Sequence, residues 1–490
     1  MKKSFDNKKY IRLQSDKILE RVNQFDGKLY IEIGGKIFDD YHASRVLKGF
    51  EIDSKVRVLQ SLKKKVEMVL TINANDIQGS KVRSDLGITY EDDVLRLVDK
   101  FEKMNLPINS VVITQYENQP SVDAYIIKLN NLGLKTYKHY LINGYPHNID
   151  KIISEEGFGK NEYVETIKPI VVVTAPGPGS GKMATCLSQL YHDNLRGIKS
   201  GYAKFETFPV WNLPLKHPVN LAYEAATADL NDVNMIDYYH LEKYGVQATT
   251  YNRDIEVFPV LSKIFEKIYG TCPYASPTDM GVNMVGHAII NDQNACESSK
   301  QEIIRRYLDA ICAYKLGKVN IECLDKIAMI MKALNVSVND RKCVGTALKK
   351  SIELNKDVVA IELTNGKVIT GKSSTLLSAA SAAVINVLKY YAKLPNELDL
   401  ISQTLINPIL KLKKEKLHYS IIRLDLSDIL VALAITATTN PAAELALNQL
   451  EKLKGTELHS SVMLSGEELK TIKTLNINAT MEPTQNTKLI

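Results

Sequence analysis

Five residues between two predicted secondary-structure elements carry the strongest chemical signal in the sequence. They lie within residues 177–182, the glycine loop, and are Gly177, Gly179, Ser180, Gly181 and Lys182. Glycine lacks a Cβ and tolerates positive φ, so backbone N–H groups in such a loop can approach a ligand closely. Together with the ammonium group of Lys182, these amides predict a cofactor-binding site for an anion, above all a phosphate group.

The segments that flank the glycine loop strengthen this prediction. Residues 170–174 form a continuous apolar, β-branched run, which predicts a strand buried on both faces. Residues 183–194 have the spacing of an amphipathic helix. A strand, a glycine-rich turn and a helix in this order direct the helix N-terminus at an anion. The alternative is a tight turn that needs glycine for its backbone geometry alone.

The glycine loop departs from the Walker A pattern at two positions. That pattern has glycine where this chain has Pro176, and serine or threonine where it has Met183. Pro176 and Pro178 also lack an N–H group, which reduces the number of donors. Since methionine cannot hold Mg²⁺ as a hydroxyl group does, phosphoryl transfer in the usual P-loop manner is not expected, and no metal site is predicted.

A second stretch, residues 366–373, matches the Walker A spelling in full. Its first glycine follows an asparagine between two β-branched runs, which predicts a hairpin turn rather than a phosphate loop. Lys372 and Ser373 stand just before a helix predicted at residues 374–392. A secondary anion or cofactor-binding site is therefore predicted at these two residues.

Polar side chains crowd the turns that follow the first two predicted strands. The candidate catalytic residues there are Asp39, Asp40, His42 and Asp76, and the candidate cofactor-binding residues are Lys36 and Asn75. A carboxylate near a histidine can act as a general acid–base pair. Because ligands of parallel sheets bind at the carboxyl ends of the strands, we expect Lys36, His42 and Asn75 to converge on the mouth of the glycine loop. The alternative is that the aspartates and asparagines cap turns and helices.

The elements that must position these residues alternate regularly between strand and helix. Strands are predicted at residues 29–34, 66–72, 110–115, 135–141 and 170–174, with helices between them. This alternation indicates βαβ units, and hence an α/β fold with a doubly wound, mostly parallel, Rossmann-like sheet. The strand at residues 170–174 is predicted to be central, because its residues are all apolar or β-branched.

The pattern of predicted elements divides the chain into three regions. Residues 1–205 are predicted to form the α/β ligand-binding domain, and residues 206–345 a mainly helical region packed on it. One of the helices predicted in this middle region covers residues 232–243. Residues 346–490 are predicted to form an α+β C-terminal domain that begins with the hairpin described above.

Composition narrows the classes of partner. The 62 basic and 56 acidic residues give a net charge of +6 that is spread thinly, so no nucleic-acid partner is expected. The sequence has neither an apolar run of membrane-spanning length nor a signal-peptide pattern, so we expect no membrane partner and a cytoplasmic location. The six cysteines form no C-x-x-C pair, as is typical of reduced thiols. Whether the chain forms a homo-oligomer is left open.

Four stretches of the chain carry a resemblance to a known family: residues 31–47, 72–76, 174–186 and 370–374. With these motifs the chain resembles, over nearly its full length, a bacterial family that carries only a domain-of-unknown-function label. Some members bear the name "ATP-dependent peptidase". The resemblance implies no reaction and no catalytic residue, and the sequence shows no Ser-His-Asp, Cys-His or H-E-x-x-H arrangement for peptidase chemistry.

Three classes of function fit these observations. The first is an enzyme that acts on a nucleotide or another phosphorylated small molecule bound at the glycine loop. The second is a nicotinamide-dinucleotide-dependent oxidoreductase, although the loop reads G-x-G-x-G instead of G-x-G-x-x-G and follows the fifth strand instead of the first. The third is a non-catalytic binding or scaffolding protein with a structural glycine loop. The sequence specifies neither the substrate nor the cofactor.

Overall fold

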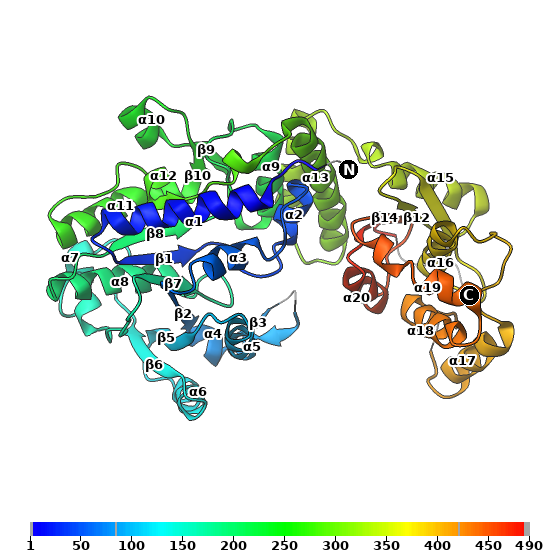
Figure 1. The fold of residues 1–490 in the computed structure, drawn as a ribbon, viewed down its shortest axis with the longest axis horizontal. Helices are drawn as coiled ribbons and strands as arrows, with labels where there is room; N and C mark the ends of the chain where they lie inside the picture. The colour runs from blue at the N-terminus through cyan, green and yellow to red at the C-terminus, as the bar shows by residue number, and fades with distance from the viewer. Residues whose placement is uncertain (1–2, 84–85, 420–421, 485–490) are drawn as a thin grey trace. The chain divides into compact units, whose positions relative to one another are not determined.

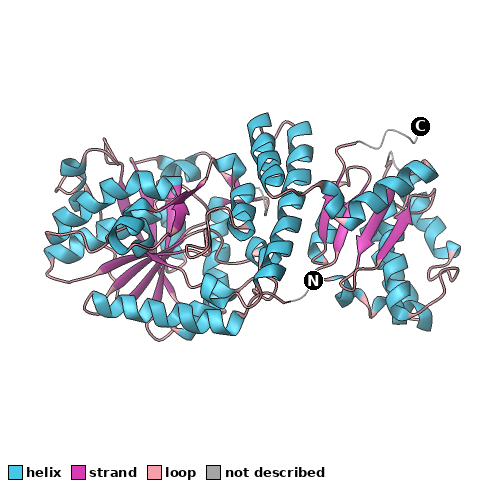
Figure 2. Cartoon of the chain, turned by 90° about the horizontal axis from the view of Figure 1, so that it is seen from above, coloured by secondary structure: helices cyan, strands magenta, loops and turns pink. Residues whose placement is uncertain are grey.

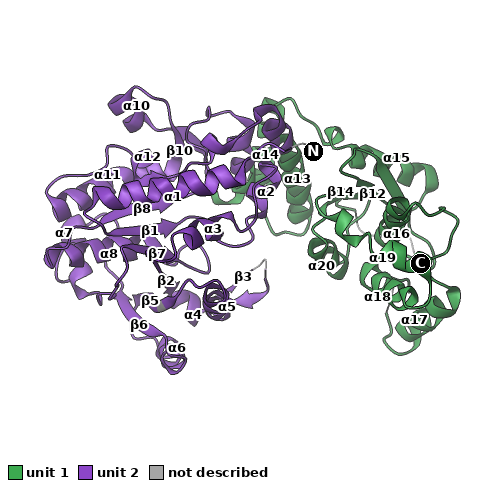
Figure 3. Cartoon of the chain, viewed as in Figure 1, with its two compact units in different colours: residues 1, 225–230, 300–490 green, residues 2–224, 231–299 purple. Residues whose placement is uncertain are grey.

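The computed structural model describes residues 3–83, 86–419 and 422–484. The chain divides into two compact units (Figure 3). The N-terminal unit comprises residues 2–224 and 231–299, and the C-terminal unit comprises residues 225–230 and 300–490 together with residue 1. Among the described residues, no helix has the length and apolar character needed to cross a membrane.

A seven-stranded sheet organises the N-terminal unit, and every neighbouring pair of its strands is parallel (Figure 1). In spatial order its strands are β11 (Gly281–Val282), β8 (Gly201–Phe205), β1 (Leu29–Ile33), β7 (Ile170–Thr174), β2 (Val66–Asn73), β5 (Ile108–Tyr116) and β6 (Lys135–Tyr140). The predicted α/β class with a doubly wound parallel sheet is confirmed. So is the central place of β7, which lies between β1 and β2 with every residue buried.

Helices cover both faces of this sheet (Figure 2). On one face Tyr30 of β1 donates a hydrogen bond from its hydroxyl to Asp193 of α8, at 2.9 Å. Successive strand side chains point to opposite faces, so Ile31 points to the face opposite to that of Tyr30. Helix α1 contacts both strand β8 and helix α3. The helices and 3₁₀ helices up to residue 288 are α1 (Asn7–Gln24), α2 (Tyr41–Val46), α3 (Ser54–Ser61), α4 (Ala74–Gln78), α5 (Tyr90–Glu102), α6 (Pro120–Asn131), α7 (Ile149–Ile152), η1 (Phe158–Lys160), α8 (Lys182–Leu195), α9 (Pro218–Ala226), η2 (Ala228–Leu230), α10 (Tyr238–Tyr244), α11 (Asn252–Tyr269), α12 (Pro277–Met280) and η3 (Gly286–Ala288).

Two small antiparallel pairs complete this part of the chain: β3 (Val82–Arg83) with β4 (Ile88–Thr89), and β9 (Asn234–Ile236) with β10 (Thr249–Tyr251). The second pair corrects the helix predicted at residues 232–243. Only α10 is helical there, and the carboxylate of Asp237 caps it by accepting the N–H of His240 at 3.0 Å. The residues before it pair with β10, a contact between distant residues that helical periodicity does not reveal.

The middle of the chain is largely helical, as predicted, and leads into a mixed sheet. That sheet has the order β13 (Val368–Lys372), β12 (Val358–Glu362), β14 (Glu457–Ser460) and β15 (Asn478–Met481). Strand β12 pairs antiparallel with β13 and β14, whereas β14 and β15 are parallel. The remaining helices are α13 (Asp292–Lys315), α14 (Ile321–Ala333), η4 (Val338–Asp340), α15 (Lys342–Leu354), α16 (Ala379–Ala392), α17 (Gln403–Glu415), α18 (Leu426–Ala437), α19 (Pro441–Leu447), η5 (Leu450–Leu453) and α20 (Gly466–Thr474).

The predicted hairpin at the second Walker A spelling is confirmed, since Gly366, with φ of 82°, lies in the turn between β12 and β13. The helix predicted to begin at residue 374 is wrong at its start. Ser374 instead forms a turn in which its hydroxyl accepts the amides of Leu376 and Leu377, at 3.2 and 3.0 Å. Helix α16 begins only after Ser378, the residue that caps it.

Candidate functional site

The glycine loop connects the carboxyl end of β7 to the first turn of α8, as predicted. Its last glycine, Gly181, is the N-cap of α8 and has φ of 80°, in the left-handed region. A glycine offers no side chain to the amides of the first helical turn, which have no partner within the helix itself. The loop therefore presents the positive end of a 14-residue helix to whatever lies beside it.

Neighbouring strands hold the glycine loop in place through its carbonyl groups. Asn73, at the end of β2, donates from Nδ2 to the carbonyl oxygen of Gly179 at 3.2 Å. Thr114 of β5 donates from Oγ1 to the carbonyl oxygen of Ser180 at 3.1 Å. The hydroxyl of Ser180 donates back to the carbonyl oxygen of Gly177 at 2.9 Å. Because the N–H of a trans peptide points opposite to the carbonyl of the preceding residue, the amides of Ser180 and Gly181 point away from these strand side chains.

Two glycines in the loop are required by close packing. A Cβ on Gly177 would stand 2.3 Å from the hydroxyl oxygen of Tyr90, and one on Gly181 would stand 2.7 Å from Cγ2 of Thr114. Gly179 differs, because it has φ of 76° but no atom of the described residues lies within 4 Å of the position that a Cβ would occupy. The loop is thus packed tightly at its two ends and open at Gly179.

A cavity of about 410 Å³ adjoins the open side of the glycine loop. Six consecutive residues, from Gly179 to Ala184, contribute to its wall. The rest of the wall includes the carboxyl ends of β5 and β6, through Gln115 and His139, and the carboxylate of Glu32 on β1. This is the edge of a parallel sheet at which ligands bind in doubly wound folds.

The polar groups of the cavity wall differ in charge. Burial lowers the pKa of His139 to about 4, so the ring is neutral at pH 7 and donates from Nε2 to the carbonyl oxygen of Glu162 at 3.1 Å. Burial, with a contribution from Glu32, raises the pKa of Tyr145 to about 12, so its hydroxyl keeps its proton. Glu32 accepts the hydroxyl of Tyr202 on Oε2 at 2.8 Å. Its other oxygen is a candidate acceptor for a ligand hydroxyl.

A half-buried charge cluster, Glu32, Lys204, Glu206 and Asp254, continues the same sheet edge. Glu32 and Lys204 lie side by side on β1 and β8. The ammonium group of Lys204 lies 2.8 Å from Oε1 of Glu206 and 2.7 Å from Oδ1 of Asp254. Burial lowers the pKa of Lys204, but the three carboxylates together outweigh burial and raise the pKa above its ordinary value. Lys204 is therefore a fixed positive charge.

Glu206 is the titratable member of this cluster. Burial raises the pKa of Glu206 to about 7, and Lys204 opposes this shift without cancelling it. Lys204, Glu206 and Asp254 also line a second cavity, of about 220 Å³, together with Arg21 of α1 and His240 of α10. A carboxyl group that titrates near neutral pH at the wall of a cavity can both donate and accept a proton.

We expect the Glu206 carboxyl to make the free energy of unfolding fall as the pH rises from about 4.5 to about 7. In this window the folded protein holds a proton that the unfolded chain, with the ordinary pKa of 4.5, has already lost. The stabilisation is complete below the unfolded pKa and is lost as the pH passes the folded pKa. Thermal melts across this range should show a less negative pH slope for Glu206→Gln than for the wild type.

Glu20→Gln is the matched control for this titration, because Glu20 is an exposed carboxylate on α1 that pairs with Lys17. Its melting temperature should follow the wild-type pH dependence. Identical slopes for Glu206→Gln and the wild type would contradict the raised pKa of Glu206.

The candidate catalytic residues predicted from the sequence make local structural contacts. Asp40 caps α2 by accepting the N–H of Ala43 at 3.2 Å, and it pairs with Lys55 at 3.2 Å. Asp39 has φ of 58° and lies 3.5 Å from the ammonium group of Lys100. Asp76 pairs with Lys81 at 3.0 Å. The ring of His42 packs against the rings of Phe208 and Tyr223, with centroid distances of 5.1 and 5.3 Å. A catalytic role for these residues stays a prediction.

The predicted cofactor-binding residues of the N-terminal unit fall into three groups. Gly179, Ser180, Gly181 and Lys182 line the cavity of about 410 Å³, and Gly177 packs at the start of the loop. Asn75 is one contact away from that cavity, because its Nδ2 donates to Oε1 of Gln115 at 3.0 Å. Lys36 is exposed after β1, and its carbonyl oxygen accepts the ammonium group of Lys55 at 3.0 Å. The convergence of Lys36, His42 and Asn75 on the loop stays a prediction.

Lys372 and Ser373 lie at the end of strand β13 and not at a helix N-terminus. The amide of Ser373 donates to the carbonyl oxygen of Asp357 at 2.9 Å. A helix dipole therefore does not act at these residues in the way that the predicted secondary anion site requires.

Sequence reasoning missed Glu32, Lys204 and Glu206. A signal for them was present, because each is a charged residue inside or directly after a strand that is otherwise apolar. Charged side chains at the carboxyl ends of parallel strands are candidates for a ligand site. Asn73 and Thr114, which hold the loop, are polar residues in the same kind of position.

Comparisons with known proteins agree over the whole chain. The N-terminal model of the domain of unknown function DUF1846 matches residues 3–335, and the C-terminal model of the same family matches residues 339–490. A UPF0371 protein of Streptococcus pneumoniae serotype 4 (strain ATCC BAA-334 / TIGR4) is 54% identical over 482 residues, which cover 98% of each chain. The UPF0371 protein of Streptococcus pneumoniae strain CGSP14 is 53% identical over the same shares. The chain therefore belongs to the DUF1846 family, with both the N-terminal and the C-terminal domain of that family present.

Proposed function

We propose that this protein binds a phosphorylated small molecule, with the phosphate group at the glycine loop and the remainder of the ligand in the cavity of about 410 Å³. The observation that carries the proposal is the geometry of the loop. Its carbonyl groups are bound to β2 and β5, and its residues from Gly179 onward face a cavity.

The N-terminus of α8 supplies the donors for the phosphate group. The first turn of any helix has amides without a partner inside the helix, and those of Lys182, Met183 and Ala184 belong to residues that line the cavity. The helix macrodipole and the charge of Lys182 both favour an anion at this point. Met183 stands where a P-loop enzyme has its Mg²⁺ ligand, so the proposal is anion binding without that ligand.

The wall residues outside the glycine loop suit a polar, uncharged group such as a sugar. Glu32 offers a carboxylate oxygen to hydroxyl groups, and Tyr145 and Gln115 can each donate a hydrogen bond. A carboxylate in the wall of the same cavity would repel a second phosphate group, so hydroxyl groups are the better match for Glu32.

The size of the cavity and the strand order favour a mononucleotide or a sugar phosphate over a dinucleotide. A volume of about 410 Å³ lies near the lower end of the range for small-molecule sites. In the dinucleotide-binding fold, one strand leads into the glycine loop and a second strand follows the helix after that loop. These two strands are neighbours in the sheet. Here β8 follows α8, but β1 separates β8 from β7.

Thermal-shift measurements with matched pairs of ligands test this proposal. We expect a nucleotide or sugar phosphate to raise the melting temperature, while the corresponding nucleoside or free sugar does not. A ligand at 100 times its Kd stabilises the native state by about 2.7 kcal/mol, which is readily measured. A shift with NAD(H) or NADP(H) alone would favour the oxidoreductase alternative. No shift with any phosphorylated compound would favour a purely structural loop.

A further inference from the structure

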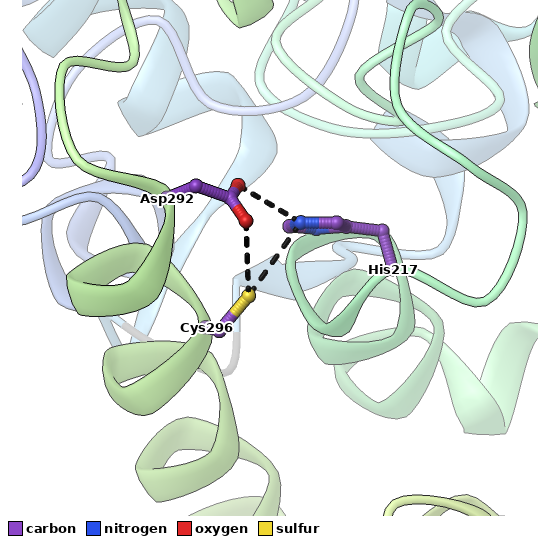
Figure 4. A group of neighbouring side chains, drawn as sticks. All are labelled: His217, Asp292 and Cys296. Carbon is purple, nitrogen blue, oxygen red and sulfur yellow. Dashed lines mark hydrogen bonds and ion pairs between the residues drawn. The ribbon is translucent and has the colours of Figure 1, made fainter.

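A second group of side chains in the N-terminal unit, His217, Asp292 and Cys296, has the composition and geometry of a metal site (Figure 4). We propose that these three residues bind a divalent transition-metal ion, Zn²⁺ in the first instance, independently of the glycine loop. The six cysteines of the chain form no disulfide, and all six lie among the described residues, so Cys296 can serve as a thiolate ligand.

Two helices place the three ligands. Asp292 and Cys296 are four residues apart at the start of α13, so their side chains point to the same side of that helix. His217 directly precedes α9, and its carbonyl oxygen accepts the amides of Asn220 and Leu221, both at 3.0 Å. This backbone geometry fixes the direction from which the imidazole approaches α13.

The distances from the imidazole to the other two side chains match those around a tetrahedral zinc ion. From the usual Zn–S, Zn–N and Zn–O bond lengths, the edges of such a tetrahedron are about 3.5 Å for S–N, about 3.3 Å for N–O and about 3.5 Å for S–O. Nε2 of His217 lies 3.5 Å from Sγ of Cys296 and 3.0 Å from Oδ1 of Asp292. Sγ of Cys296 lies 3.7 Å from Oδ2 of Asp292. The S–N and N–O distances agree with these edges within about 0.3 Å, whereas the S–O distance is measured to the second oxygen of the same carboxylate. With one oxygen of Asp292 as the ligand atom, the three ligand atoms lie within 4.8 Å of one another, so one metal ion can contact all three after a rotation of the Asp292 carboxylate.

The donor set and its exposure indicate the kind of ion. A thiolate, an imidazole and a carboxylate together suit Zn²⁺ and other borderline ions better than Mg²⁺ or Ca²⁺, which prefer oxygen alone. The side chain of Asp292 is 63% exposed, so solvent reaches the site. Three protein ligands with access to water resemble an open zinc site rather than a closed structural one.

One hydrogen bond opposes metal binding. The amide of Val219 donates to Nδ1 of His217 at 3.2 Å, so the neutral ring carries its proton on Nε2 and donates it to Asp292. A metal at Nε2 requires that proton to move to Nδ1, which gives up the bond from Val219. Leaving the amide of the buried residue Val219 without its acceptor reduces affinity by about 5- to 150-fold, which is small beside the affinity that three such ligands supply. We therefore expect binding that is specific but weaker than at a structural zinc site.

Titration of the full-length, chelator-treated protein with Co²⁺ tests the proposal, because Co²⁺ occupies zinc sites and has a visible spectrum. We expect one ion per chain, a thiolate-to-cobalt charge-transfer band and the intense d–d bands of tetrahedral coordination, all displaced by Zn²⁺. Cys296→Ser should abolish the charge-transfer band. Cys272→Ser is the matched control, since Cys272 lies in the same unit with its thiol donating to the carbonyl oxygen of Tyr274, and it should keep the full spectrum.

Asp292→Asn provides a second, conservative variant that does not depend on the thiol. It should keep the charge-transfer band while weakening Co²⁺ affinity by about tenfold or more, because even the loss of a residue that only hydrogen-bonds to a ligand typically costs about 10- to 100-fold. Circular dichroism of the metal-free variants checks that they are folded. Absence of a charge-transfer band in the wild type, or the same band in Cys296→Ser, would overturn the proposal. An effect of Cys272→Ser equal to that of Cys296→Ser would do so as well.

These outcomes are separate from the proposed phosphate site. Loss of Co²⁺ binding in Cys296→Ser should leave the thermal shift with phosphorylated ligands unchanged, because His217, Asp292 and Cys296 do not belong to the cavity at the glycine loop. A variant that lost both properties would contradict the independence of the two sites.

Discussion

Replacing Lys182 by alanine is expected to weaken the binding of a phosphorylated ligand by about 1–3 kcal/mol, which is about 5- to 150-fold in Kd. Lys182 is the first residue of α8 and lines the cavity, so its ammonium group and the first-turn amides act on the same anion. Removing the charge leaves the amides in place, and some affinity should therefore remain. Titration calorimetry with the ligand found by thermal shift measures the difference directly.

Lys372→Ala is the control for this experiment, because Lys372 is the lysine of the second Walker A spelling but lies at the end of β13. Its replacement should leave the affinity within about twofold of the wild type, as expected for an exposed lysine. The melting temperature of ligand-free Lys182→Ala should also stay close to that of the wild type. If Lys372→Ala lost more affinity than Lys182→Ala, the principal phosphate site would lie in the C-terminal unit.

Gly181→Ala is expected to lower stability by about 2–4 kcal/mol and to abolish most ligand binding. Part of the cost is the left-handed backbone, since φ of Gly181 is 80° and a residue with a Cβ loses about 1–2 kcal/mol there. The rest comes from the new Cβ, which would stand 2.7 Å from Cγ2 and 2.9 Å from Oγ1 of Thr114. Thr114 would have to move, and its hydrogen bond to Ser180 holds the loop.

Gly179→Ala separates these two costs. Its φ of 76° is nearly the same as that of Gly181, but within the described parts of the chain no atom lies closer than 4 Å to the place of its Cβ. Only the backbone cost of about 1–2 kcal/mol should appear. Denaturant unfolding of the two variants, followed at equilibrium, gives the comparison. Equal losses of stability would show that contact with Thr114 does not limit the residue at position 181.

The main secondary structure and the class of the fold were predictable because they follow from neighbouring residues. The apolar run of β7 predicted a central strand, and β7 lies between β1 and β2. The asparagine and glycine before β13 predicted a hairpin turn, which is present at Gly366. The regular alternation of strand and helix predicted the parallel sheet, because each βαβ crossover needs only local lengths and polarity.

The errors arose where contacts between distant residues changed the local preference. Residues 234–236 belong to the segment 232–243, whose apolar side chains have helical spacing, but they pair with β10. The start of α16 lies five residues later than predicted, at Ala379 instead of residue 374, because Ser374 forms its own turn. Serine, asparagine and aspartate offer the backbone an alternative to the helix, and tertiary contacts select between the two.

Local sequence therefore specified most of the strands, helices and turns, and that a glycine loop precedes α8. Which residues come together at the candidate sites depended on the tertiary structure, because strand order decides which side chains become neighbours. Glu32 meets Lys204 only because β1 pairs with β8, and His217 meets Cys296 only because two helices far apart in sequence approach each other. Strand order is set by packing summed over the whole sheet, a quantity that no stretch of neighbouring residues contains.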